Sequence, residues 1–161
     1  MKTYLFLFMM SAFIVIGCKS ATSGAAAYKP AKCITSDYKD FTLEWGYDYA
    51  DSPQIMGYQL DENGYILLYK QDRDTRVKSF DSLGRIEGDK ICNILEQLNS
   101  EMLKMPTLNE PGKKLCYIIL KKPNVGMLNR VIWNEHNTYG SKGYRNLFDS
   151  LLSIVPHNFR N

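Results

Sequence analysis

Apolar and polar residues alternate along much of the chain after residue 40, and this alternation predicts β-strands. Residues 41–46 place Phe, Leu and Trp on one side and Thr, Glu and Gly on the other, which is the period of a half-buried strand. Shorter segments of the same character follow at 56–60, 65–69 and 77–80. The first half of the chain therefore predicts three or four strands.

Turn-forming residues separate these strands. Residues 47–53, Tyr-Asp-Tyr-Ala-Asp-Ser-Pro, predict a loop, and Asp61–Gly64 contains an Asn-Gly pair that suits a type I′ hairpin turn. Asp72–Asp74 predicts another turn, and Asp81–Gly84 predicts the turn that ends the strand at 77–80.

Two later segments have the period of a helix. From about Gly88 to Leu103, apolar residues recur three and four positions apart, and Pro106 stops the pattern. A second helix is expected after Ser141, a plausible amino-terminal cap, and before Pro156. The centres of the two apolar stripes, which we expect in the core, are Ile94, Leu98, Phe148 and Leu151.

Two further strands are expected between the helices, at 115–120 and 128–133. The predicted order is thus three or four strands, a helix, two strands and a helix. Strands joined by hairpins, with two helices to cover a face, predict an α+β fold with a mostly antiparallel sheet of five to six strands and two covering helices. This layout is loosely similar to that of emfourin-type inhibitors of secreted metalloproteases, although no motif carries the similarity and it assigns no residue.

The amino terminus has the features of an export signal. Lys2 precedes an apolar run over residues 4–16, which is shorter than the ~20 residues of a membrane-spanning helix. The run closes with Gly17 and Cys18, and this ending resembles a bacterial lipobox. An uncleaved apolar helix, or an ordinary signal with an incidental cysteine, is the alternative.

The lipobox resemblance implies diacylation of the Cys18 sulfur, cleavage before Cys18 and acylation of the new amino group, so that the mature protein carries three acyl chains. Two or more chains hold a protein firmly to a membrane. Lys19 stands where an aspartate can mark retention in the inner membrane, so the resemblance favours the outer membrane. The expected organisation is a signal peptide at 1–17, a lipid anchor with a flexible tether at 18–33, and one domain at 34–161.

Composition narrows the possible partners. Removal of residues 1–17 from 161 leaves 144, enough for one domain with its own core. The formal charge of the whole chain is +3, too small to imply nucleic acid. We therefore expect a membrane contact through the acyl chains and a protein partner, and no nucleic acid.

Three cysteines follow the lipobox. Cys92 lies near the edge of the apolar stripe of the first predicted helix, and Cys116 lies in the apolar strand expected beneath it, so these two form the most plausible disulfide, with Cys33 left at the tether. Two buried thiols acting as small hydrophobic side chains are an equal alternative.

The residues that could carry catalysis are sparse. His136 and His157 are the only histidines, and the apolar neighbours of Cys92 and Cys116 argue against a Cys-His nucleophile pair. The spacing of Cys, His and acidic residues matches no zinc or calcium site. We expect no catalytic residue, no metal and no cofactor, and a hydrolase or thiol enzyme is the least favoured class.

Charge and tyrosine are unevenly distributed. Five acids and one lysine lie in 34–52, whereas six bases and one acid lie in 104–130. These two oppositely charged segments could steer a charged partner, or they could attract each other across the fold. The loop residues Tyr47, Asp48, Tyr49 and Asp51 combine aromatic rings with acids, a composition typical of recognition surfaces. Rings that cap an open sheet edge are the alternative.

The sequence therefore predicts a lipid-anchored protein of the cell envelope that acts as a non-catalytic binding module. An inhibitor of an exported protease is the alternative.

Overall fold

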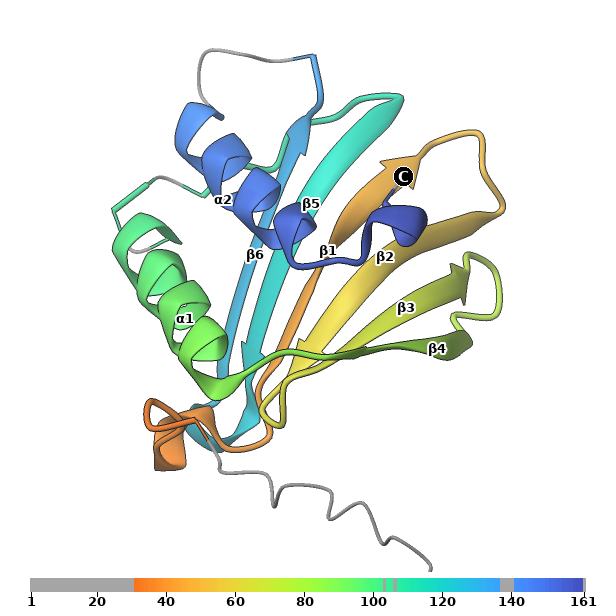
Figure 1. Ribbon diagram of the computed structural model, residues 1–161. Coiled ribbons are helices and arrows are strands. Elements are labelled where there is room, and N and C mark those ends of the chain that lie inside the picture. Colours follow the sequence, from red (N-terminus) through yellow and green to blue (C-terminus); the bar gives the residue numbers. More distant parts are fainter. Residues whose placement is uncertain (1–30, 103, 106, 137–140, 161) are drawn as a thin grey trace, which may run out of the picture.

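The computed structural model describes residues 31–102, 104–105, 107–136 and 141–160. The predicted signal peptide, Cys18 and most of the predicted tether lie outside these residues. The described chain forms a six-stranded antiparallel sheet in the order β4-β3-β2-β1-β5-β6 (Figure 1). The strands are β1 Thr42–Tyr49, β2 Gln54–Asp61, β3 Tyr65–Asp72, β4 Lys78–Arg85, β5 Lys114–Lys122 and β6 Met127–Asn134.

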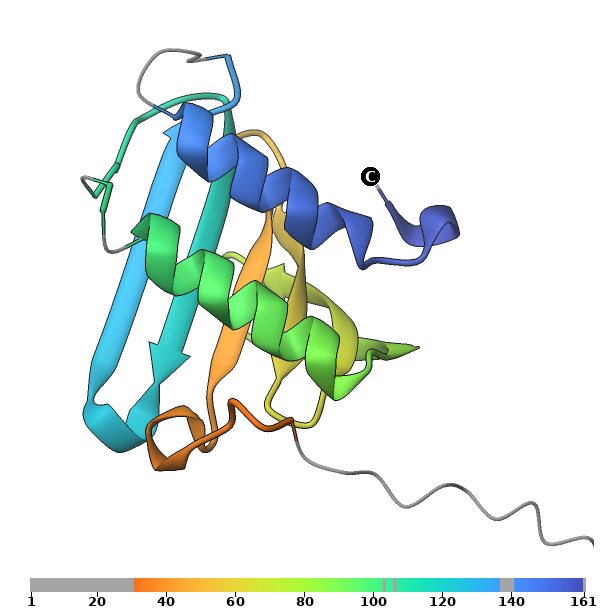
Figure 2. The same cartoon turned by 60° about the vertical axis from the view of Figure 1, so that its left-hand side comes forward.

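Both helices cover the same face of this sheet. Helix α1 spans Gly88–Met102 and α2 spans Lys142–Ser153, and they lie side by side in front of the strands in Figure 2. The described residues also form three short 3-10 helices: η1 Ser36–Tyr38, η2 Pro123–Val125 and η3 His157–Phe159. The predicted α+β class, strand number and element order are confirmed. Within the described residues, neither helix is long and apolar enough to cross a membrane.

The core lies between the helices and the sheet. Ile94, Leu98, Phe148 and Leu151 are all at most 5% exposed, as predicted from the helical stripes. They meet the two tryptophans of the sheet, Trp45 and Trp133, which are fully buried. Burial of this apolar face provides most of the driving force for docking the helices.

Three local predictions were wrong. Strand β1 continues to Tyr49 instead of giving way to a loop at 47, because it pairs with β5 as far as Tyr49↔Lys114. Strand β4 continues through Asp81–Gly84, where a bulge opposite Ile66/Leu67 and a φ of 131° at Gly84 absorb the irregularity. The β2–β3 hairpin forms as predicted, but Asn63 does not have the positive φ of a type I′ turn; only Gly64 does, at 82°.

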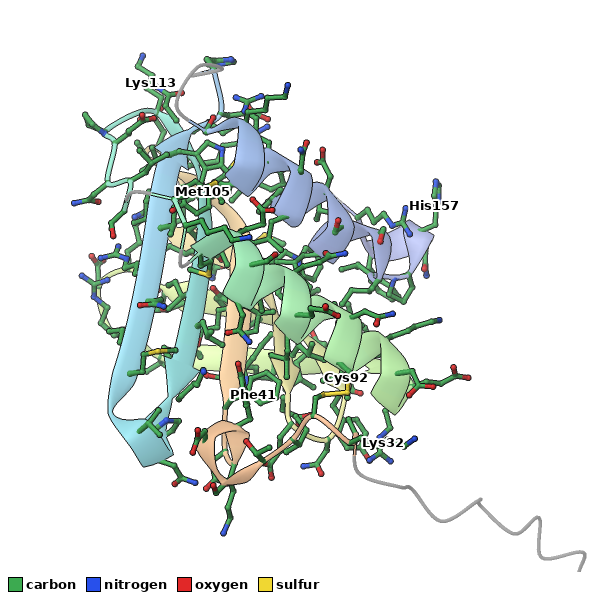
Figure 3. All side chains as sticks on the ribbon, turned by 90° about the vertical axis from the view of Figure 1, so that its left-hand side faces the viewer. Lys32, Phe41, Cys92, Met105, Lys113 and His157 are labelled. Atoms are coloured by element: carbon green, nitrogen blue, oxygen red, sulfur yellow. A yellow bond between two sulfur atoms is a disulfide. The ribbon has the colours of Figure 1, made fainter. Side chains whose placement is uncertain are left out.

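The disulfide also differs from the prediction. Cys33 and Cys92 are bonded, with their Cα atoms 5.4 Å apart, whereas Cys116 is a buried free thiol. The Cys92–Cys116 pairing was wrong because Cys92 lies near the edge of the α1 stripe and faces the segment before β1. That segment packs closely on the helix start, with Ala31 buried against Gly88. Figure 3 shows the bond beside Lys32, at the amino-terminal end of α1.

Candidate functional site

The face of the sheet opposite the helices carries a second, smaller apolar cluster. Its buried members are Tyr69, Tyr117 and Ile132, and Ile55, Leu115 and Ile119 pack against them. We call this surface the open face, because both helices lie on the other side of the sheet (Figure 2). It brings together residues from β2, β3, β5 and β6.

Two glycines shape the centre of the open face. Gly46 of β1 and Gly57 of β2 are paired directly, Gly57 is opposite Tyr69, and Gly46 is opposite Tyr117. A methyl group on Gly57 would come within 2.0 Å of the Tyr117 hydroxyl, and one on Gly46 within 2.7 Å of it. The Tyr117 side chain therefore occupies the space that ordinary side chains at these two positions would take.

The two tyrosine hydroxyls form a hydrogen-bonded pair over the glycines. Their oxygens are 2.6 Å apart, and the Tyr117 hydroxyl also donates to the Met56 carbonyl at 3.2 Å. Burial raises the pKa of Tyr69 and of Tyr117 well above the usual tyrosine range. Both phenols, which are neutral near pH 7 even at the ordinary tyrosine pKa of 10.0, therefore stay neutral into the alkaline range.

Ion pairs neutralise two carboxylates of the open face, Glu44 and Asp48. Glu44 is only 4% exposed, and its Oε1 accepts from Lys121 Nζ at 2.7 Å and lies 2.9 Å from Lys78 Nζ. Asp48 pairs with the Arg73 guanidinium. Lys78 Nζ also lies 4.4 Å from the centre of the Tyr69 ring, so a cation already occupies that aromatic face.

A cavity of about 150 Å³ lies between these groups. Apolar side chains of Ile55, Ile119 and Ile132 line it together with the two tyrosines, and Arg76 and Arg130 stand among its polar lining residues. Both arginines are exposed. Among the described residues, neither has an ion pair or hydrogen bond from its side chain.

The recognition residues predicted from sequence do not form one surface. Tyr47 points to the helix side of the sheet, where its ring centre is 5.2 Å from that of Phe148, and Asp48 points to the open face. Tyr49 is exposed, and Lys114 Nζ lies 5.3 Å from its ring centre and 4.6 Å from that of Tyr47. Asp51 is exposed in the short loop between β1 and β2. The alternation of a strand, which here continues to Tyr49, separates Tyr47 and Tyr49 from Asp48.

The open-face residues were not selected from the sequence, although one signal was present. In the sequence, Gly46 and Gly57 each fall on the side of a strand opposite its large apolar residues, and a glycine inside a strand often marks a close approach of other groups. The partner of each glycine depends on strand order, which the sequence pattern does not specify.

The groups considered for catalysis are dispersed. Cys116 faces the helices, and burial raises the pKa of its thiol to about 11, so it is not a nucleophilic thiolate at neutral pH. His136 is exposed in the turn after β6. Glu44 and Asp48 line the same cavity, but they are four positions apart on β1, so their Cα atoms are about 13 Å apart. In the described part of the chain, no cluster of three or more His, Cys, Asp or Glu residues could hold a metal ion.

No family model and no curated protein sequence matches this chain.

Proposed function

We propose that the protein is a lipid-anchored, non-catalytic binding module of the bacterial cell envelope, and that its partner docks on the open face of the sheet. The observation that carries the proposal is the cavity between Tyr69, Tyr117 and Ile132, on the side of the sheet opposite α1 and α2. Concave sites with apolar walls and a few convergent polar groups are typical of binding sites.

The anchor rests on the lipobox resemblance around Cys18. Metabolic labelling with a fatty-acid analogue tests it. Cys18→Ala should abolish the label and release the protein from the membrane fraction, whereas Cys116→Ala, which removes a different unpaired thiol, should keep both. Equal labelling of Cys18→Ala and wild type would contradict the anchor.

The docking face can be tested by site-specific photo-crosslinking in intact cells. A photoreactive residue in place of Ile119 lies on the open face, and one in place of Gln97 lies on the outer side of α1 and serves as the control. We expect a discrete adduct from position 119 alone, and excess unmodified domain should suppress it. An adduct that appears equally from position 97, or that resists competition, would contradict docking on the open face.

A protease inhibitor is a second candidate, favoured by the rigid loop between β1 and β2. Ala50 N–H donates to the Lys113 carbonyl at 2.8 Å, and Arg73 donates to the carbonyls of Tyr49 and Ser52, each at 2.6 Å. A short exposed loop held in this way could enter a protease cleft. Inhibition of a purified exported protease by wild type, and its loss in Arg73→Gln, would favour this candidate over the binding module.

A further inference from the structure

We propose that the open-face cavity binds a carboxylate carried on an apolar group of about the size of a benzene ring. The inference rests on the proposed function, because it assigns a ligand chemistry to the same face. It follows from the charges around the cavity, from its apolar walls and size, and from the tyrosine hydroxyls.

The charges around the cavity favour an anion. Five cations surround the cavity. Arg76 and Arg130 line it, and Arg73, Lys78 and Lys121 form ion pairs with the carboxylates that line it. They face two carboxylates, Glu44 and Asp48, which leaves a formal excess of three positive charges. An anion that enters the cavity is therefore attracted, even though two carboxylates line it.

The same contacts disfavour a cationic ligand. Glu44 is already paired with two lysines and Asp48 with Arg73, so a cation would have to displace one of them. The Tyr69 ring already has Lys78 over its face. The groups that remain available are two guanidiniums, Arg76 and Arg130, and a guanidinium fits a carboxylate through two parallel hydrogen bonds.

The walls and size of the cavity set the rest of the ligand. Ile55, Ile119 and Ile132 provide apolar walls. Its volume of about 150 Å³ is close to that of an apolar cavity known to hold benzene. A bare inorganic anion would leave these walls unfilled, whereas a ring or branched aliphatic group would contact them.

The tyrosine pair can add a donor. In one arrangement the Tyr69 hydroxyl donates to the Tyr117 oxygen, and the Tyr117 hydroxyl donates to the Met56 carbonyl. If Tyr117 instead donates to Tyr69, the Tyr69 hydrogen becomes available to a ligand oxygen. Both phenols are neutral near pH 7, so neither carries a negative charge that would repel an anion.

Phenylacetate is the first probe, because it joins a carboxylate to one ring. Isoleucine δ1-methyl NMR of the full protein can follow Ile55, Ile119 and Ile132 in the cavity, with Ile91, Ile94 and Ile118 of the helix-side core as internal references. We expect phenylacetate to shift the cavity methyl signals, and phenylacetamide, its neutral counterpart, to bind at least tenfold more weakly. A peptide, acetyl-Ala-Ala-Phe, tested with a free and an amidated carboxyl terminus, distinguishes a partner's chain end from a free acid.

Arginine variants test the role of charge. Arg130→Gln and Arg76→Gln should each weaken phenylacetate binding about tenfold, while Lys90→Gln, which removes an exposed charge on α1, should not change it. Unchanged reference methyl signals show that each variant is folded. Equal binding of acid and amide, or indifference to both arginine variants, would overturn the anion site and leave open-face docking intact. Failure of every acid to shift the cavity methyl signals would also overturn it, and the cross-linking result would then decide the proposed function separately.

Discussion

The hydroxyl oxygens of Tyr69 and Tyr117 lie 2.6 Å apart, although β2 and β1 separate the strands that carry them. Neighbouring strands are ~4.8 Å apart, so the two Cα atoms are separated by roughly 14 Å in a flat sheet. The side chains can meet only because Gly57 and Gly46 stand between them and leave the surface of the sheet bare. The pair and the cavity beside it thus depend on two residues that have no side chain.

Gly57→Ala should therefore be strongly destabilising. Its methyl group would lie 2.0 Å from the Tyr117 hydroxyl and 2.7 Å from the Trp45 carbonyl, and the second contact is with backbone in the centre of the sheet. We expect a loss of about 1–3 kcal/mol in the free energy of unfolding, the usual cost of overpacking, measured by urea unfolding. Tyr117→Phe, which removes only the hydroxyl, should cost about 1 kcal/mol. A Gly57→Ala protein as stable as wild type would show that the tyrosines do not lie over the glycines.

The sequence contained the elements of the fold but not the site, for a physical reason. Helix and strand periods are local, so the stripes with Ile94, Leu98, Phe148 and Leu151 identified the helix side of the core. Strand order and register are non-local, and they alone place Tyr69 opposite Gly57 and Tyr117 opposite Gly46.

Local periodicity also could not predict the disulfide, because that bond joins segments far apart in the sequence. The helical period correctly put Cys92 near the edge of the α1 stripe, but it could not show that the chain before β1 returns to that edge. Likewise, a turn-like composition at 47–53 was overridden at Tyr47–Tyr49 by pairing with β5.

The Cys33–Cys92 disulfide should be present in the folded protein. Trypsin would place the three cysteines on separate peptides, 33–39, 91–104 and 115–121, so mapping without reduction identifies the pair directly. Closing a separation of 59 residues is worth about 4 kcal/mol in the chain-entropy description. Cys33→Ser/Cys92→Ser should therefore unfold at lower urea concentration. A linked 91–104 and 115–121 pair would contradict the structure.

Truncation of the helix stripes should destabilise the core. Leu98→Ala and Leu151→Ala each remove a fully buried side chain between the helices and the sheet. We expect each to cost about 2–5 kcal/mol, visible as a lower melting temperature. Glu96→Ala, at an exposed position of α1, is the matched control. A shift no larger than that of the control would mean that the helix faces are wrongly assigned.

The buried thiol should make stability fall at alkaline pH. The folded pKa of Cys116 is raised from 9.0 to about 11 by burial, so between these values the unfolded chain releases a proton that the folded protein keeps. The contribution is complete below pH 9 and is lost as the pH rises toward 11. Urea midpoints between pH 8 and 10 should decline in wild type and less steeply in Cys116→Ala. The window stops at pH 10 because four tyrosines with raised pKa values, Tyr47, Tyr69, Tyr117 and Tyr144, contribute increasingly above it, and the comparison with Cys116→Ala isolates the contribution of the thiol. Parallel pH profiles would contradict a thiol buried in its neutral form.

The two lysines at Glu44 should act together. The Glu44 side chain is 5% exposed, while those of Lys78 and Lys121 are 23% and 42% exposed, so either lysine alone can keep the carboxylate paired. Lys78→Met and Lys121→Met should each cost at most about 1 kcal/mol, because these ion pairs are partly screened by solvent.

The double variant leaves a buried carboxylate without a partner, and breaking such a pair costs about 3–5 kcal/mol. We therefore expect the double variant to lose clearly more stability than the two single variants together, and Glu44→Gln to restore much of that loss when added to it. Urea unfolding of the five proteins, wild type included, measures the coupling. Additive effects of the lysine variants, or no rescue by Glu44→Gln, would show that the Glu44 carboxylate is hydrated instead of held by the two lysines.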